Sequence, residues 1–117
     1  MRALALGFEA EADVWLEDGW FLGHDAPVYP ISYEFLETPG LWLHCKHYPA
    51  LKTLLLDERL NCFYHTDEDY VLTAHGYIWA YPGMPGGERT ICVMPERTGQ
   101  RIDRFAGVCS DYVNRYR

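Results

Sequence analysis

The sequence lacks a long apolar run and a cluster of basic residues. A membrane-spanning helix needs about 20 predominantly apolar residues in succession, so we expect no membrane span. The 10 Lys and Arg are outnumbered by 17 Asp and Glu, and the formal net charge is −7. A phosphate backbone would be repelled by this charge, so nucleic acid is not an expected partner. The first eleven residues make a poor signal peptide, because acids closely follow a short apolar patch, and we expect a cytoplasmic protein.

Several motifs of known chemistry are also missing. The four cysteines show no C-x-x-C spacing, which argues against a zinc ribbon or a dithiol redox centre, and we expect buried free thiols. The Gly/Pro-rich stretch at residues 81–88 lacks the Lys-Ser/Thr ending of a phosphate-binding loop. No G-x-S-x-G motif is found, so a hydrolase of the nucleophile-elbow type is not indicated.

What the sequence does contain is a series of short apolar segments separated by turn signals. These predict strands at residues 9–16, 20–23, 41–46, 62–65, 77–81, 90–95 and 106–112. Helices are expected at 1–8, 31–37 and 50–60, and residues 67–73 are ambiguous, with one helical turn as an option. Short strands with helical pieces between them fit a parallel α/β sheet or barrel. At 117 residues, the chain is expected to form a single domain, residues 1–117.

The first predicted strand carries acids at alternate positions. Glu9, Glu11 and Asp13 share one face because side chains alternate along a strand, and small apolar residues occupy the other face. Carboxylates that face an enclosed space are costly unless they bind a cation or a partner, and two hard oxygen ligands suit Mg²⁺ or Ca²⁺. The alternative is an edge strand with a solvated acidic face, and the pattern alone does not separate the two.

A histidine follows this strand on a loop. His24 comes directly after Gly23 and the predicted hairpin, near the same strand end. An imidazole there can donate or accept a proton near neutral pH. A loop histidine is more often simply solvated, so this residue gains interest only beside the acidic strand.

The motif formed by these two features resembles that of a known family. The segments EADV and EDGWFLGHD are similar to the E-x-D-V…D-G…H-D signature of the glycerophosphodiester phosphodiesterase family, within the phospholipase-C-like phosphodiesterase superfamily. LWLHCK resembles the family strand that usually reads E-x-K, and AGVCSDYV resembles the closing strand. The resemblance implies a (β/α)₈ fold, here a compact or N-terminally truncated TIM-type barrel.

The resemblance also implies roles for individual residues. Glu11 and Asp13 would bind a divalent metal ion, and His24 would act as the general acid. The E-x-K strand places His44 where the family has a third metal-binding glutamate, and Lys46 where it has a lysine near the phosphate. Because His44 replaces an oxygen ligand with nitrogen, the preference shifts from Mg²⁺ or Ca²⁺ towards Mn²⁺ or Zn²⁺.

The front of the chain departs from the family pattern. The family begins with a strand that carries a His-Arg pair, and no His-Arg dipeptide occurs in this sequence. We therefore expect a domain that lacks the first strand, with an open sheet edge that favours self-association. A full barrel also normally needs about 200 to 250 residues, so this would be an unusually compact one.

Three further residues are candidates for a substrate site. Trp42 shares a predicted strand face with His44 and Lys46, so it can flank a ligand, as can Trp79 if its face points inward. His65 ends a predicted strand. It can line the same mouth of the expected barrel as the end of the acidic strand, or it can serve only as a hydrogen-bonded structural residue. His47 should face away from His44, so these two do not form a joint site.

Two functions remain in view. The first is a metal-dependent phosphoric diester hydrolase acting on a small phosphodiester, weak or inactive in this chain unless the missing first strand is supplied. The second is a non-catalytic barrel-derived module that binds a ligand or another protein. The absent His-Arg pair and the histidine at position 44 favour the second.

Overall fold

The computed structural model describes residues 8–116 and divides the chain into two compact units. One unit extends to His65 and the other begins at Thr66. The helix expected at residues 1–8 falls almost entirely outside the described residues. The expectation of a single domain concerns folding behaviour and stays a prediction.

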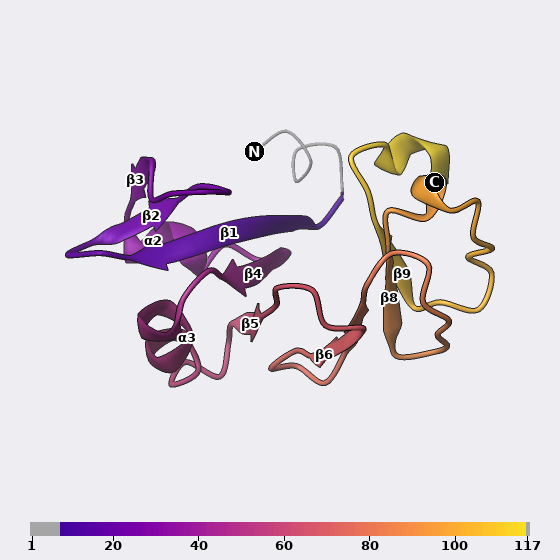
Figure 1. Ribbon diagram of the computed structural model, residues 1–117. Helices are drawn as coiled ribbons and strands as arrows, with labels where there is room; N and C mark the ends of the chain where they lie inside the picture. The colour runs from indigo at the N-terminus through magenta and orange to yellow at the C-terminus, as the bar shows by residue number, and fades with distance from the viewer. Residues whose placement is uncertain (1–7, 117) are drawn as a thin grey trace. The chain divides into compact units, whose positions relative to one another are not determined.

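From residue 8 onward, the N-terminal unit is a five-stranded mixed sheet with two short helices (Figure 1). Its spatial order is β3-β2-β1-β4-β5, with β1, β4 and β5 parallel and the β1–β2 and β2–β3 pairs antiparallel. The bounds are β1 Ala10–Leu16, β2 Trp20–Leu22, β3 Tyr29–Ile31, α2 Tyr33–Leu36, β4 Leu41–Cys45, α3 Tyr48–Leu54 and β5 Asn61–Tyr64.

Alternation along β1 and β4 builds the core of this unit. Ala12 and Val14 of β1 are buried, and they lie on the face opposite Glu11 and Asp13. Leu43 and Cys45 of β4 are fully buried on the same side. The apolar faces of the helices complete the core through Leu36 of α2 and Ala50 and Leu54 of α3. Its other buried members are Leu41, Leu60 and Cys62. The small apolar face of β1 thus packs beneath helices, as its sequence predicts.

The C-terminal unit is a four-stranded mixed sheet of order β6-β7-β8-β9 (Figure 1). The β7, β8 and β9 strands are parallel and β6 is antiparallel to β7. The bounds are β6 Tyr70–Leu72, β7 Ile78–Ala80, β8 Thr90–Val93, the 3₁₀ helix η1 Pro95–Arg97, β9 Gly107–Cys109 and the 3₁₀ helix η2 Val113–Tyr116. Residues 66–116 of this unit contain no α-helix of their own.

The prediction of a TIM-type barrel is wrong. The described residues form two small mixed sheets that do not close into a barrel, and their α-helices have only 4 and 7 residues. Each unit of a (β/α) barrel requires a crossover helix long enough to cover its strands. The connections from β7 to β8 and from β8 to β9 contain no α-helix, so they cannot supply that outer layer.

Most of the predicted strands, and the helices predicted near residues 31–37 and 50–60, are confirmed, with three corrections. Residues 67–73 contain the strand β6 rather than a helical turn, and the strand β3 was not predicted. The helix expected at 50–60 begins at Tyr48 and ends at Leu54, because the chain then turns through a hydrogen bond from the Asp57 amide to the Leu54 carbonyl. The four cysteines are free thiols, as expected; three of them are buried as expected, whereas Cys109 is half-buried. Among the described residues, no helix is long and apolar enough to cross a bilayer.

Candidate functional site

The pairing of β1 with β4 assembles the candidate site. These two strands run parallel, with Glu11 opposite Trp42 and Asp13 opposite His44. Partners in adjacent strands project to the same face of a sheet, so the acids of β1 and the alternate polar residues of β4 meet there. The backbone amide of Lys46 donates to the Val14 carbonyl at 3.0 Å, which continues the pairing just beyond β4.

Three side chains on this face form a compact group of potential metal ligands. One carboxylate oxygen each from Glu11 and Asp13 and a ring nitrogen of His44 all lie within 4.8 Å of one another. Asp13 Oδ1 is 3.1 Å from His44 Nδ1, and the side chains of Asp13 and His44 are 14% and 15% exposed. Glu11 is the exposed member of the group. We refer to these three residues as the Glu-Asp-His group.

The imidazole of His44 is fixed from its other side. His44 Nε2 lies 2.7 Å from the backbone carbonyl oxygen of His65. A carbonyl can only accept a hydrogen bond, so Nε2 carries the proton and donates it. The ring also stacks on Phe63, with centroids 5.2 Å apart and planes 7° from parallel. His44 therefore presents Nδ1, and not Nε2, to Asp13.

The carboxyl of Asp13 is held in its ionised form. Burial raises its pKa, but the side-chain contacts with His44 and Glu11 and the electrostatic effects of His44 and Lys46 lower it to about 2 overall. The charge of Lys46 thus acts on this group even though its ammonium is not a ligand.

One oxygen of this carboxylate has no directed hydrogen bond. Asp13 Oδ1 is buried and, within the described residues, no donor hydrogen is aligned on it, although His44 Nδ1 lies at 3.1 Å. In a neutral His44 ring, the Nδ1 lone pair would face this negative oxygen. Such a pair is stable only when a proton or a cation lies between the two atoms.

A divalent cation fits this arrangement. Nitrogen and oxygen ligands lie about 2.0–2.2 Å from a transition-metal ion, so neighbouring ligands of one ion are about 3.0–3.5 Å apart. The 3.1 Å separation of His44 Nδ1 and Asp13 Oδ1 falls within that range. The backbone partner on Nε2 is also the kind of outer contact that orients a metal-binding histidine.

The backbone next to His24, and not its side chain, is hydrogen-bonded to the strand that carries Asp13. Its neighbour Gly23 donates from its amide to the carbonyl of Asp13 at 3.2 Å. The His24 ring itself is 81% exposed, and its Nδ1 lies 2.9 Å from Asp25 Oδ1. His24 is therefore close to the site along the chain, while its imidazole contacts another carboxylate.

The predicted substrate-binding residues fall into two units. Trp42 lies on the face of the Glu-Asp-His group, and its indole donates to Glu9 Oε1 at 2.7 Å. The ring of His65 lies 6.1 Å from that of His44, edge to face. Trp79 belongs to β7 of the C-terminal unit and is only 6% exposed. Substrate contact by these three residues stays a prediction.

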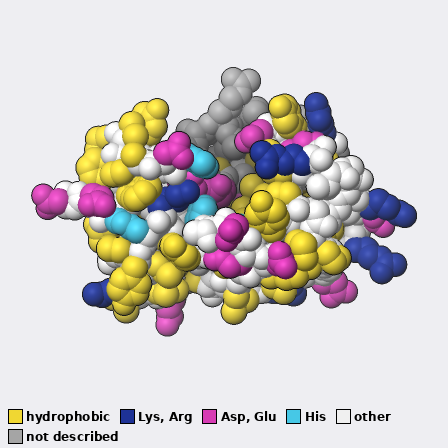
Figure 2. All heavy atoms as spheres, viewed as in Figure 1, with side chains coloured by type: hydrophobic (Ala, Val, Ile, Leu, Met, Phe, Trp, Pro, Cys, Tyr) yellow, Lys and Arg dark blue, Asp and Glu magenta, His cyan; other side chains and the backbone are white. Residues whose placement is uncertain are grey.

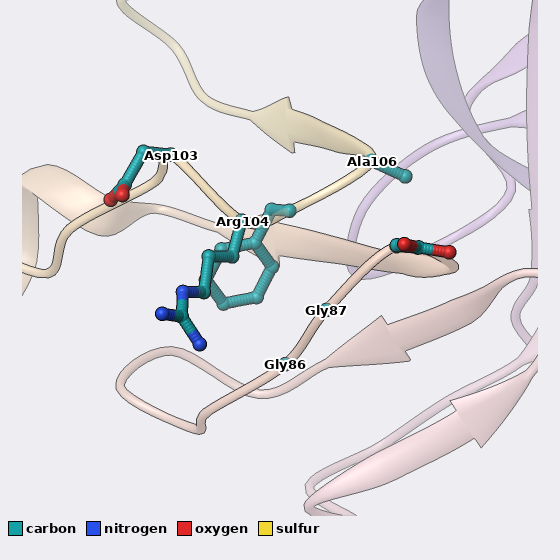
Figure 3. Close-up of a pocket in the computed structure, with 7 residues that line it drawn as sticks. Gly86, Gly87, Asp103, Arg104 and Ala106 are labelled. Carbon is teal, nitrogen blue, oxygen red and sulfur yellow. The ribbon is translucent and has the colours of Figure 1, made fainter.

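Polar side chains gather visibly on the N-terminal unit. Figure 2 shows histidine, acidic and basic side chains close together on the face of this unit that is in view. The C-terminal unit has a separate hollow of about 630 Å³, lined by Gly86, Gly87, Glu88, Asp103, Arg104, Phe105 and Ala106. Figure 3 shows the Asp103 and Arg104 side chains that line it, and Asp103 Oδ1 lies 3.5 Å from Arg101 Nε at the surface. The charged residues of this lining are Glu88, Asp103 and Arg104.

The residues that support the site were harder to foresee. Trp15 follows Asp13 at period two, which places it on the acidic face, but its hydrogen bond to the Gly23 carbonyl depends on the hairpin that returns β2. The anchoring of His44 by a backbone carbonyl leaves no mark in the sequence at all.

Comparison with known proteins does not identify a relative. No family model, no curated protein and no solved structure matches this chain. The function must therefore be argued from the geometry of the N-terminal unit.

Proposed function

We propose that this chain binds a divalent metal ion through Glu11, Asp13 and His44, and uses it to bind a small phosphodiester. The observation that carries this proposal is the convergence of the three ligand atoms within 4.8 Å, with a buried Asp13 oxygen facing His44 Nδ1. The donor set of two carboxylates and one imidazole suits Mn²⁺ or Zn²⁺ better than Mg²⁺ or Ca²⁺.

The reaction that we assign to the site is hydrolysis of a phosphoric diester, with low turnover. A bound divalent ion supplies Lewis-acid polarisation of a phosphoryl oxygen. Lys46, whose charge already acts on Asp13, neutralises the phosphate. His24 follows Gly23, whose backbone amide is hydrogen-bonded to the Asp13 carbonyl. In this proposal, the His24 imidazole protonates the departing alkoxide.

Turnover is expected to be low because half of the acid–base pair is missing. The chain has no His-Arg dipeptide to supply the second histidine, and each acid–base group contributes roughly 10²–10⁴-fold to the rate. A second candidate function is binding of a phosphate ester without catalysis. It is favoured by the 81% exposure of His24, whose imidazole pairs with Asp25.

Metal binding is tested first, by thermal unfolding in the presence of Mn²⁺, Zn²⁺, Mg²⁺ or Ca²⁺. An ion at 100 times its Kd stabilises the folded state by about 2.7 kcal/mol, which the double variant Glu11→Gln, Asp13→Asn should abolish. The matched control is Asp18→Asn, on the same hairpin. Asp18 is exposed and has φ of 54°, a conformation that asparagine tolerates well. An unchanged metal-induced shift in the double variant would refute the ligand assignment.

Hydrolysis of bis-p-nitrophenyl phosphate, assayed with each ion in turn, separates the two functions. Slow metal-dependent turnover that His24→Ala abolishes supports the hydrolase. Metal binding without turnover, together with retention of a non-hydrolysable phosphodiester, supports the binding function. If the chain binds neither metal nor phosphodiester, both are wrong.

A further inference from the structure

A tryptophan and a glycine join the acidic strand to the loop that carries His24. Trp15 lies two residues beyond Asp13 on β1, and its indole Nε1 donates to the carbonyl of Gly23 at 2.7 Å. The amide of Gly23 in turn donates to the carbonyl of Asp13 at 3.2 Å. Both polar groups of the Gly23 backbone are thus hydrogen-bonded to β1, the strand that carries Glu11 and Asp13 of the Glu-Asp-His group.

The loop after Gly23 is folded tightly back on itself. A Cβ added at Gly23 would lie 1.8 Å from the carbonyl oxygen of Ala26, which no side chain can tolerate. The amide of Val28 donates to the Leu22 carbonyl at 3.1 Å and closes the loop. The backbone of His24 therefore has little freedom as long as Gly23 stays in place.

Trp15 is itself held from the opposite side. Its ring meets that of His47 edge to face, with centroids 5.2 Å apart. His47 Nε2 accepts a hydrogen bond of 2.8 Å from the Leu16 amide, so the imidazole cannot turn away from the strand. A second element thus fixes the indole whose N–H reaches Gly23.

We infer that Trp15 is a positioning residue that holds the His24 loop beside the Glu-Asp-His group. This inference rests on the proposed metal site and adds to it the means by which an exposed histidine is kept at that site. The indole N–H is the group that matters, because the aromatic ring alone cannot bond to the Gly23 carbonyl.

The variant that isolates this group is Trp15→Phe, which keeps an aromatic ring and removes the donor. The matched control is Trp20→Phe, because Trp20 lies on the same hairpin and packs edge to face against Tyr33. Two measurements are made by NMR on the full chain. One is hydrogen exchange of the Gly23 amide, with the Leu43 amide of β4, a strand paired on both sides, as the reference for overall stability. The other is relaxation of the His24 ring by a small fraction of Mn²⁺, relative to the His65 ring.

Trp15→Phe should lower the protection of the Gly23 amide relative to the Leu43 amide about fivefold, which is the contribution of one hydrogen bond. It should also reduce the Mn²⁺ relaxation of His24 relative to His65 severalfold, with the affinity for Mn²⁺ unchanged. A purely structural role would lower the protection of both amides equally.

Two results would overturn the inference. One is unchanged protection of Gly23 in Trp15→Phe, which needs no metal to be observed. The other is unchanged relaxation of His24 while Mn²⁺ still binds. Failure of Mn²⁺ to bind the wild-type chain at all would refute the proposed function and, with it, the positioning role towards the metal.

Discussion

Replacing Asp13 by asparagine should change how stability depends on pH. The pKa of this carboxyl falls from 3.8 to about 2 in the folded chain, since its contacts with His44 and Glu11 outweigh the effect of burial. At 1.36 kcal/mol per pKa unit, this difference corresponds to about 2 kcal/mol. With a side chain only 14% exposed, little of that energy is lost to solvent screening.

The direction follows from the lowered pKa. The ionised form is favoured in the folded state, so the stabilisation is fully present above about pH 4 and is lost as the pH falls towards 2. Asp13→Asn should therefore cost about 2 kcal/mol at pH 7, and the difference from wild type should nearly vanish at pH 2. Asp18→Asn, at an exposed position of the same hairpin, should leave both values unchanged.

Urea unfolding followed by tryptophan fluorescence measures this effect, in metal-free buffer at pH 7, 4, 3 and 2. Three of the four tryptophans, Trp15, Trp20 and Trp42, belong to the N-terminal unit, so the signal mainly follows the unit that contains Asp13. If wild type and Asp13→Asn lose stability in parallel between pH 4 and pH 2, the carboxyl is not held ionised by its neighbours, and the electrostatic description of the group is wrong.

Three further predictions concern the metal, the core and assembly. His44→Glu should move the metal preference from Mn²⁺ or Zn²⁺ towards Mg²⁺ or Ca²⁺, because it replaces the nitrogen ligand with an oxygen ligand. An unchanged order of affinities by calorimetry would exclude His44 as a ligand. Leu43→Ala should destabilise by about 2–5 kcal/mol because this side chain is fully buried, whereas Leu56→Ala, at 84% exposure, should change stability by about 0.5 kcal/mol or less. Equal losses of stability for the two variants in urea unfolding would contradict the described core. Self-association through an exposed sheet edge should appear as dimers or larger species in size-exclusion chromatography with light scattering, and a monomer at all concentrations would argue against it.

The sequence alone determined which residues share a face. Alternation along β1 separates Glu11 and Asp13 from Ala12 and Val14 because successive side chains of any strand point to opposite faces. The same rule placed His44 with Trp42 on β4, and their partly exposed side chains are those opposite the buried Leu43. The free thiols, and most of the strands and both α-helices within residues 8–116, were also predictable, since local composition and turn residues indicate them.

The tertiary structure decided which strands pair and where the sheets end. The pairing of Asp13 with His44 depends on the parallel register of β1 and β4, which lie some thirty residues apart, and no local pattern encodes such a register. The barrel prediction failed because closure of a barrel requires crossover helices between its strands. The connections from β7 to β8 and from β8 to β9 contain no α-helix. The tautomer of His44 and the bond from Trp15 to Gly23 likewise depend on backbone carbonyls, which every residue carries, so only the folded chain brings them to these side chains.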